Sequence, residues 1–200
     1  MRKVVSRLFC SVDGYTTGRD PEDMDWAVAY QGPQTLQLGL DAIRDSELMV
    51  LGRVTYEMFA AYWPTASPEV EGDLPEVMNR TPKMVFSTTL QAPLAWQNST
   101  LNRGDVAAEI PRLKQQSGRD IGIWGSVTLV RSLLRLGLLD RLQLQVYPVA
   151  LGTTGTRPLF EGFDRTTLEL VDSKVLDGQV VLLDYQTTPT SVQSHEAPRP

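Results

Sequence analysis

The chain of 200 residues is long enough for one domain with a sizeable core, and 42% apolar with 22% charged residues is the composition of a globular protein. A formal net charge of −5, with Lys and Arg scattered along the chain, argues against binding nucleic acid through its phosphates. No stretch is apolar for long enough to cross a membrane, and the N-terminus enters a strand pattern at once, so we expect a cytoplasmic protein without a signal peptide.

Cysteine and histidine are too few for several common kinds of site. Cys10 is the only cysteine, which excludes a disulfide within the chain and a CxxC metal site. The only histidine, His195, lies in a Pro- and Ser-rich segment at the end of the chain, so neither a Ser-His-Asp hydrolase nor a histidine zinc site is expected. We therefore predict that the protein binds no metal.

The first half of the chain alternates between strands and helices. Lys3 to Cys10 predicts a first strand, and the irregular segment from Ser11 to Gly32 has a length typical of a functional loop. Pro33 opens a helix whose apolar residues recur at helical spacing. A short buried strand at Leu48–Leu51 and a helix at Val54–Tyr62 are predicted next.

Beyond a polar connection that contains several prolines, the alternation continues. Strands are predicted at Lys83–Ser87 and Ile121–Trp124, with a helix around Val106–Leu113 between them. Ser126 has the chemistry of an N-cap for the following helix, and Gly137 lies where a helix C′ residue belongs.

The last quarter of the chain has the pattern of antiparallel strands. The stretch "DRLQLQVYP" alternates apolar and polar residues, and two further alternating runs flank the Asp177-Gly178 pair, which is a strong hairpin signal. These patterns predict an α/β fold with a mixed, mostly parallel central sheet flanked by helices and a C-terminal antiparallel hairpin. Residues 1–188 would form one domain, and residues 189–200 are predicted to be a disordered tail.

Three of the predicted strands end in an apolar run, a small or hydroxylated residue and a turn. They are "VLGRVT" (Val50–Thr55), "VFSTT" (Val85–Thr89) and "IWGSVT" (Ile123–Thr128). In a parallel sheet these turns lie at the carboxyl edge, where α/β folds bind ligands. Two of them open a helix, whose first amide groups point outward with the positive end of the helix dipole. This edge is therefore the predicted ligand site.

The residues in these turns suit a phosphate group. Gly52 and Gly125 let a phosphate approach the backbone, and Arg53 can contact it through two N–H groups. Each turn taken alone also has the pattern of a solvated turn or a simple N-cap, so the prediction depends on their meeting at one edge. Neither G-x-G-x-x-G nor G-x-x-x-x-G-K-[ST] occurs, which excludes a Rossmann dinucleotide site and a P-loop. Further hydroxyl donors at this edge are Thr55, Ser87, Thr88, Ser126 and Thr128.

The order of six motifs resembles a known superfamily. "CSVDGYTTG", "LGRVTYE", "FSTTL", "GSVTLVRSLL", "GLLDRLQLQVYPVALG" and "RPLFEG" resemble the dihydrofolate reductase-like superfamily, and most closely the group that shares the reductase domain of bacterial riboflavin biosynthesis (RibD C-terminal domain). The resemblance covers residues 2–186, and the Gly-Arg-x-Thr-Tyr-Glu stretch is its most specific part. It implies a central mixed sheet that binds NADPH and, in the riboflavin-type branch, usually a homodimer.

Carried over by position, the resemblance implies a cofactor site at the predicted edge. Arg53 would meet the 2′-phosphate of NADPH, and Ser87 and Thr88 would flank the adenine ribose. The family's usual double glycine is Gly-Ser in this chain. The adenosine-side phosphates would be held by Gly52, Arg53, Val54 and Thr55, and the pyrophosphate near the nicotinamide by Gly125, Ser126, Val127 and Thr128.

On the substrate side, Asp13 matches a residue that recurs beside the nicotinamide pocket, and we predict that it is catalytic, in proton relay or substrate orientation. Gly14 and Gly18 would let the loop that carries it move as a lid. Arg7, inside the first strand, either contacts an anionic substrate or ends at the surface. The predicted substrate-binding residues are Tyr15, Thr16 and Trp26.

The resemblance leaves three functions open. Dihydrofolate reductases carry a buried carboxylate near the start of the first helix, where this chain has Gln31, Gln34 or Leu36, so folate is not the expected substrate. The zinc deaminase that is often fused in the riboflavin branch is not found in this sequence either. We predict an NADPH-dependent reductase that transfers a hydride to a small heterocyclic or conjugated imine or carbonyl substrate. The alternatives are 5-amino-6-(5-phosphoribosylamino)uracil reductase of riboflavin biosynthesis and, from another class, a non-catalytic nucleotide-binding protein that keeps the fold.

Overall fold

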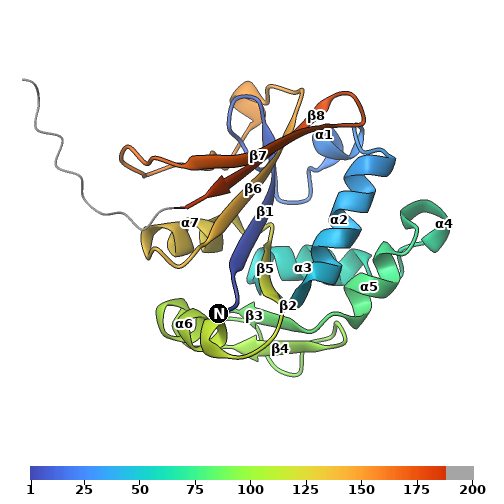
Figure 1. Cartoon of the computed structure of the whole chain (residues 1–200). Coiled ribbons are helices and arrows are strands. Elements are labelled where there is room, and N and C mark those ends of the chain that lie inside the picture. Colours follow the sequence, from blue (N-terminus) through green and yellow to red (C-terminus); the bar gives the residue numbers. More distant parts are fainter. Residues whose placement is uncertain (188–200) are drawn as a thin grey trace, which may run out of the picture.

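The computed structural model describes residues 1–187, in which eight strands form one sheet in the order β4-β3-β2-β5-β1-β6-β8-β7 (Figure 1). The strands from β4 to β6 in this order run parallel, β8 pairs antiparallel with β6, and β7 pairs antiparallel with β8. The predicted mixed, mostly parallel sheet with a C-terminal antiparallel hairpin is confirmed. The strands are β1 (Val4–Ser11), β2 (Ser46–Gly52), β3 (Lys83–Phe86), β4 (Ser99–Asn102), β5 (Asp120–Trp124), β6 (Arg141–Tyr147), β7 (Glu169–Leu176) and β8 (Val180–Gln186).

Helices cover both faces of the sheet. In Figure 1, α2, α3 and α5 lie on one side of the sheet and α6 and α7 on the other, and each group packs on its own apolar core cluster. None of the helices within residues 1–187 combines the length and hydropathy needed to cross a membrane. The helices are α1 (Asp25–Val28), α2 (Pro33–Asp45), α3 (Arg53–Tyr62), α4 (Pro68–Glu71), α5 (Leu74–Arg80), α6 (Val106–Gln115) and α7 (Val127–Arg135), with a 3-10 turn η1 (Gly152–Thr154).

The sheet order brings the three predicted turns to one edge. β2 pairs in parallel with β3 on one side and with β5 on the other, and Gly52 is in register with Phe86. α3 begins directly after β2, and α7 begins two residues beyond the end of β5. The prediction that two of the three strand ends open a helix is therefore confirmed.

Several short elements were not predicted from the sequence. The proline-rich connection contains α4 and α5, because Pro68 and Pro75 occupy first-turn positions where a missing N–H costs nothing. α1 interrupts the predicted loop from Ser11 to Gly32. β4 is a short, largely polar edge strand whose four residues carry no clear period. The predicted tail, residues 189–200, lies outside the described residues.

β6 is an inner strand of the sheet. It pairs with β1 on one side and with β8 on the other. Its polar face is less exposed to solvent than the alternating sequence predicts. Gln145 is buried, and the buried Asp184 of β8 accepts hydrogen bonds from Arg141 and Gln143. The exposed edge on this side is β7.

The tip of the C-terminal hairpin holds the start of α2. Asp177, at a φ of +49°, occupies the turn between β7 and β8. Its carboxylate accepts hydrogen bonds from the backbone N–H groups of Gln34 and Thr35, at 3.0 and 2.9 Å. A carboxylate at a helix N-terminus satisfies amide groups that have no partner within the helix. This long-range cap fixes α2, which forms one wall of the cavity described below.

Lys83 is a buried cation that supports the sheet from β3. Its Nζ donates to the carbonyl oxygens of Asn79, Thr81 and Gln97, at 3.2, 2.7 and 3.2 Å, and lies 4.1 Å from the ring centroid of Trp96. Lys83→Met leaves these buried carbonyls without their donor, and we expect it to lower the free energy of unfolding by about 2–4 kcal/mol in urea titration. Lys3→Met, at an exposed position, is the control and should change it by less than about 0.5 kcal/mol.

The lowered pKa of Lys83 leads us to expect that the free energy of unfolding rises with pH. Burial lowers the pKa of Lys83 from 10.5 to about 8. Between these two values the unfolded chain binds more protons than the folded chain, so the free energy of unfolding should increase as the pH rises from 8 to 10.5. The rise should be smaller in Lys83→Met. An identical pH dependence in the two proteins would contradict this account.

Candidate functional site

A cavity of about 830 Å³ opens at the carboxyl ends of β2 and β5. The starts of α3 and α7 lie along one part of its wall, and the body of α2, the body of α3, the loop before α1 and residues of β1 and α5 form much of the rest. Most of this second part is apolar, with side chains such as Leu36, Ile43, Met58, Phe59 and Trp63. The site therefore combines a polar rim of helix starts with an apolar chamber.

The turns after β2 and β5 are tied directly to each other. The N–H of Gly52 donates to Ser126 Oγ at 2.8 Å. Both the N–H and the hydroxyl of Ser126 donate to Thr55 Oγ1, each at 2.9 Å. Ser126 occupies the N-cap position of α7 as predicted, but it is left-handed (φ +49°) and its side chain makes no cap. The predicted phosphate-binding hydroxyls of Ser126 and Thr55 instead hold the two helix starts together.

Gly125 shapes this pair of turns. It has a φ of +54°, and a Cβ placed on it would lie 3.0 Å from Thr55 Cγ2. A side chain at this position would therefore strain the backbone and press on the contact between the two turns. The amides of Val127 and Thr128, in the first turn of α7, have no partner within the helix and lie at the cavity wall. The Thr128 side chain is exposed there.

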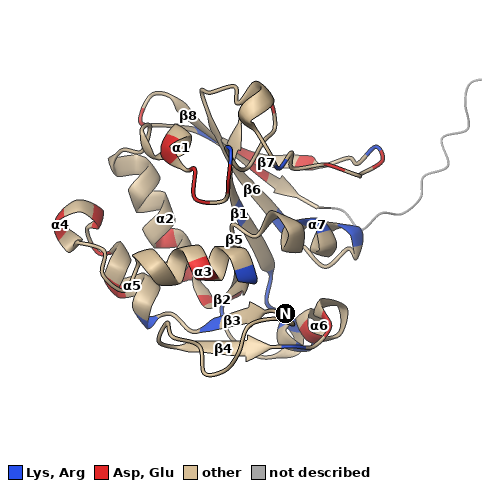
Figure 2. Cartoon of the chain, turned by 180° about the vertical axis from the view of Figure 1, so that it is seen from behind, with Lys and Arg blue, Asp and Glu red and all other residues tan. Residues whose placement is uncertain are grey.

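Arg53, the first residue of α3, lines the cavity with its side chain about half exposed. Its Nη1 forms an ion pair of 2.7 Å with Glu57 Oε2, one helical turn further along. In Figure 2 the ribbon of α3 is blue at its start and red further along the same helix. A phosphate bound by Arg53 would have to share the guanidinium with Glu57.

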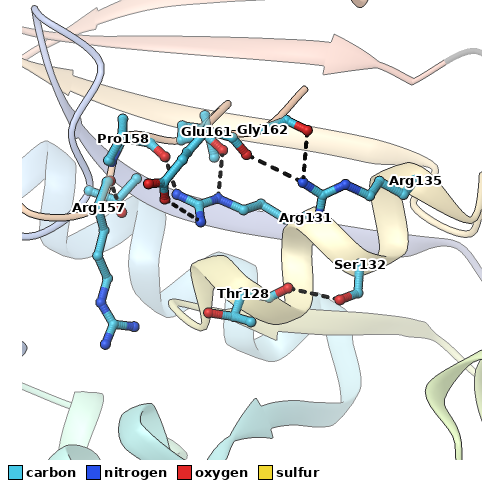
Figure 3. Close-up of polar contacts among 10 residues, drawn as sticks. Thr128, Arg131, Ser132, Arg135, Arg157, Pro158, Glu161 and Gly162 are labelled. Atoms are coloured by element: carbon cyan, nitrogen blue, oxygen red, sulfur yellow. Dashed lines mark hydrogen bonds and ion pairs between the residues drawn. The ribbon is translucent and has the colours of Figure 1, made fainter. Parts of the chain in front are cut away.

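Arg157 is a second arginine at the cavity wall, and no sequence pattern assigned it a role. Its backbone carbonyl accepts hydrogen bonds from the N–H and the hydroxyl of Thr16, at 3.0 and 2.9 Å. The residues after it are held to α7, since Arg131 donates to the carbonyl oxygens of Pro158 and Leu159. Figure 3 shows the Arg157 side chain pointing away from these contacts. The segment thus places a cation at the cavity wall, and two distant parts of the chain hold its backbone in position.

The predicted ribose contacts, Ser87 and Thr88, do not line the cavity. Ser87 Oγ accepts hydrogen bonds from the N–H groups of Thr89 and Leu90, at 3.2 and 3.1 Å, and so forms the turn after β3. Thr88 is exposed. Phe86, the last residue of β3, lines the cavity at this point.

Asp13 lies outside the cavity lining. Its carboxylate accepts hydrogen bonds from the Ser11 hydroxyl (2.5 Å) and from the N–H groups of Leu151 (3.1 Å) and Gly152 (2.7 Å). These bonds, led by the one from Ser11, hold the pKa of Asp13 below its usual value. Asp13, the predicted catalytic residue, therefore links the loop after β1 to the start of η1.

Of the three predicted substrate residues, only Thr16 lines the cavity. The ring of Tyr15 covers Gly155, where an added Cβ would lie 2.4 Å from the ring. Trp26 is buried against Tyr147 in a separate core cluster, with ring centroids 5.7 Å apart. Trp26 is thus a core residue of the loop, whereas Tyr15 is half-buried and packs on Gly155.

The proposed hinge of the lid is fixed at several points. In addition to the bonds that Thr16 donates to the Arg157 carbonyl, the backbone carbonyl of Gly14 accepts a bond from the N–H of Leu159. The carbonyls of Thr17 and Gly18 accept bonds from the N–H and the hydroxyl of Thr156. Gly18 also lies against the Asp23 carboxylate, which accepts a bond from the N–H of the next residue. The loop from Ser11 to Gly18 is therefore part of the rigid wall, and a lid hinged at Gly14 or Gly18 has no support in this arrangement.

The chemistry of the site fits a dinucleotide cofactor with phosphates at the helix starts. The cradle at Gly125, which a Cβ would fill, and two arginines at the same rim suit anionic oxygen atoms. The apolar chamber beside it is large enough for a flat ring system. Within residues 1–187 no group of three or more His, Cys, Asp or Glu side chains is placed to hold a metal ion.

Comparison with known proteins identifies the family. The Bacillus subtilis proteins YyaP and YwjB are 27% and 29% identical to the chain over 187 and 188 residues, which is 92% of this chain in each case and 94% and 97% of theirs. A putative riboflavin biosynthesis protein from Shewanella, known from a crystal structure, shares the fold with a TM-score of 0.74 at 19% identity, over 94% of this chain and 99% of that one. The model of the RibD C-terminal domain family matches residues 2–182, and the chain therefore belongs to the RibD C-terminal domain family.

Proposed function

We propose that the protein is an NADPH-dependent reductase that transfers a hydride to a small heterocyclic or conjugated imine or carbonyl substrate. The observation that carries this proposal is the meeting of two helix starts, a glycine cradle and two arginines at the rim of one apolar cavity. Membership of the RibD C-terminal domain family supports it. When bound, NADPH supplies the hydride for such a reduction.

The residues at the rim have distinct roles in this proposal. Arg53 holds the 2′-phosphate, and the first amides of α3, at Arg53 and Val54, add donors beside it. The first amides of α7 and the Arg157 guanidinium hold the pyrophosphate. Gly52 and Gly125 let the phosphates approach, and Thr55 and Ser126 keep the two helix starts in register.

The first alternative is 5-amino-6-(5-phosphoribosylamino)uracil reductase. Family membership supports it, and the Shewanella relative is described as a putative riboflavin biosynthesis protein. The largely apolar chamber favours a smaller and less polar substrate than this phosphorylated pyrimidine, because a ribose and a phosphate need several polar partners when they leave water. We therefore rank it second.

The alternative from another class is a nucleotide-binding protein without catalysis. The position of Asp13 outside the cavity favours it, because the predicted proton source does not line the chamber. A screen for loss of NADPH absorbance with conjugated imines, conjugated carbonyls and the phosphorylated pyrimidine separates the three functions. Turnover of a small imine or carbonyl supports the proposal. Turnover of the pyrimidine alone supports the first alternative, and NADPH binding without any turnover supports the second.

Replacement of Asp13 tests its role directly. We expect Asp13→Ala to lower the thermal unfolding midpoint while leaving the affinity for NADPH within about twofold of the original, because the carboxylate ties the first loop to η1. Since the pKa of Asp13 in the folded chain is below 3.8, this contribution to stability is present above pH 3.8 and is lost as the pH falls further. Loss of turnover at unchanged stability would instead establish a catalytic role.

We also propose that two copies of the chain pair through β7, the exposed edge of the sheet. Leu170, Val171 and Val175 of this strand are between 41% and 64% exposed, which leaves an apolar strip beside unpaired backbone groups. Light scattering of the protein after size exclusion tests this, with Val175→Lys as the variant. A monomeric original protein would contradict the proposal.

A further inference from the structure

Arg7 is a shielded cation that lacks hydrogen-bonding partners. It lies in the middle of β1, in register with Trp124 of β5 and Gln143 of β6. Its Nε and Nη1 are shielded from solvent and have no hydrogen-bond partner among residues 1–187. No other side chain in this part of the chain has two such atoms.

The charge of Arg7 persists at neutral pH. Burial lowers the pKa of the guanidinium to about 10, while Asp45, Asp184 and Asp120 act in the opposite direction. A shielded cation without good partners is destabilising by several kcal/mol in general. A group of this kind at a cavity wall is a candidate for contact with a ligand, and Arg7 is the one arginine of this cavity with shielded N–H groups that lack an acceptor among residues 1–187.

The surroundings of Arg7 determine the side from which an acceptor can come. Arg7 lies between the large cavity and a smaller polar one of about 450 Å³. The smaller cavity is lined by the carboxylates of Asp45, Asp120 and Asp184 and by the cations of Lys3, Arg119 and Arg141, so its charges balance among themselves. The charged residues of the large cavity besides Arg7 are Arg53, Arg157, Glu22 and Glu71, and most of the remaining lining is apolar. Because the large cavity has room for a small ligand and offers few polar groups, an acceptor on such a ligand would reach Arg7 from that side.

The chamber beside Arg7 suits a flat, apolar molecule. The Arg7 Cζ atom lies 5.5 Å from the ring centroid of Trp124, and the indole covers Gly122, where an added Cβ would lie 2.8 Å from Trp124 Nε1. Phe9 of β1, Ile43 of α2 and apolar side chains of α3 also line this space. A planar ligand in this space could pack against apolar groups while one edge meets the planar fork of the guanidinium.

We propose that Arg7 determines the substrate class, by binding a carboxylate or conjugated carbonyl oxygen at one end of a flat, otherwise apolar substrate. This inference rests on the proposed reductase function, because it assigns the acceptor to the molecule that is reduced. Amino-substituted heterocycles present N–H donors to a group that can only donate, and the site disfavours them. Arg7 thereby acts as a specificity-determining residue in a part of the cavity that the phosphates of NADPH do not occupy.

Three probes of one shape test the inference by calorimetric titration. They are 2-naphthoate (anionic), 2-naphthylmethanol (neutral) and 2-naphthylmethylammonium (cationic), each titrated with and without saturating NADPH. We expect the intact chain to bind the anion about 10- to 100-fold more tightly than the alcohol, and the alcohol more tightly than the cation. Arg7→Met, which keeps the length of the side chain, should abolish the preference for the anion, and Arg7→Lys should retain part of it.

Stability separates this role from a structural one. Arg7→Met removes a shielded charge with two N–H groups that lack hydrogen-bond partners among residues 1–187, so its thermal unfolding midpoint should equal or exceed that of the intact chain. A lower midpoint with an unchanged preference for the anion would overturn the inference, and so would failure of the intact chain to prefer the anion. These outcomes leave the proposed function standing if NADPH still binds. An Arg7-dependent preference in a chain that does not bind NADPH would instead show that the anion site exists and that the reductase assignment is wrong.

Discussion

Gly125→Val should weaken the binding of NADPH at least about 100-fold, which corresponds to the loss of two or more charge-assisted hydrogen bonds. A Cβ at this position would lie 3.0 Å from Thr55 Cγ2, and the φ of +54° is one that valine strongly disfavours. Relief of both strains moves the turn, and with it the bond between Ser126 N and Thr55 Oγ1 that aligns the two helix starts. Equilibrium titration of the variant with NADPH measures the effect.

Gly137→Val is the matched control for this substitution. Gly137 follows α7, has a φ of +64° and has no neighbouring atom within 4 Å of an added Cβ. Both variants therefore carry the same kind of backbone strain, but only Gly125→Val crowds the cavity wall. We expect both variants to lose a similar amount of stability and only Gly125→Val to lose affinity for NADPH. Equal affinities of the two variants for NADPH would show that the turn after β5 is not part of the cofactor site.

Arg53→Ala is expected to weaken NADPH binding about 10- to 100-fold while leaving NADH binding within about twofold. The two nucleotides differ only in the 2′-phosphate, so the selective loss reports the contact between this group and the Arg53 guanidinium. Titration of the intact chain and the variant with both nucleotides measures it. An equal loss for both nucleotides would place Arg53 elsewhere on the cofactor or give it a structural role.

The neighbour of Arg53 offers a gain-of-affinity test of the same contact. Glu57 pairs with Arg53 at 2.7 Å and adds a negative charge beside the proposed phosphate. Glu57→Gln removes this competition, and we expect it to strengthen NADPH binding by about two- to fivefold. Glu76→Gln is the control, because Glu76 forms the same kind of ion pair with Arg80 on α5. Unchanged affinity in Glu57→Gln would show that Arg53 does not meet the phosphate.

The long elements of the fold could be predicted because their patterns are local. The helix from Pro33, the helix ending before Gly137 and the hairpin at Asp177 each follow from residues within one or two turns of each other. β4 was missed because its pairing with β3 depends on a neighbour in space. α4 and α5 were missed because their prolines, which usually break helices, occupy first-turn positions.

The edge of the sheet that holds the site could also be predicted, whereas the roles of single side chains there could not. Thr55 and Ser126 are hydroxyl residues at helix starts, but their mutual bonds depend on how α3 and α7 sit side by side. Asp13 matches a family motif, yet its partners Leu151 and Gly152 are 138 and 139 residues away in the chain.

Arg157 illustrates the opposite case. It opens the "RPLFEG" motif, but that motif predicted no role for it, and it reaches the cavity through tertiary contacts, among them the bonds from Thr16 to its carbonyl oxygen. A local sequence pattern cannot report such a placement.

Equilibrium titration of the intact chain with NADPH and with NADH tests the central claim most directly, since the roles assigned to Arg53, Gly125 and Arg157 depend on dinucleotide phosphates at the starts of α3 and α7. The account predicts saturable binding of both nucleotides, with NADPH bound more tightly. Failure of both nucleotides to bind would contradict it and would leave a RibD-type fold whose cavity serves another ligand.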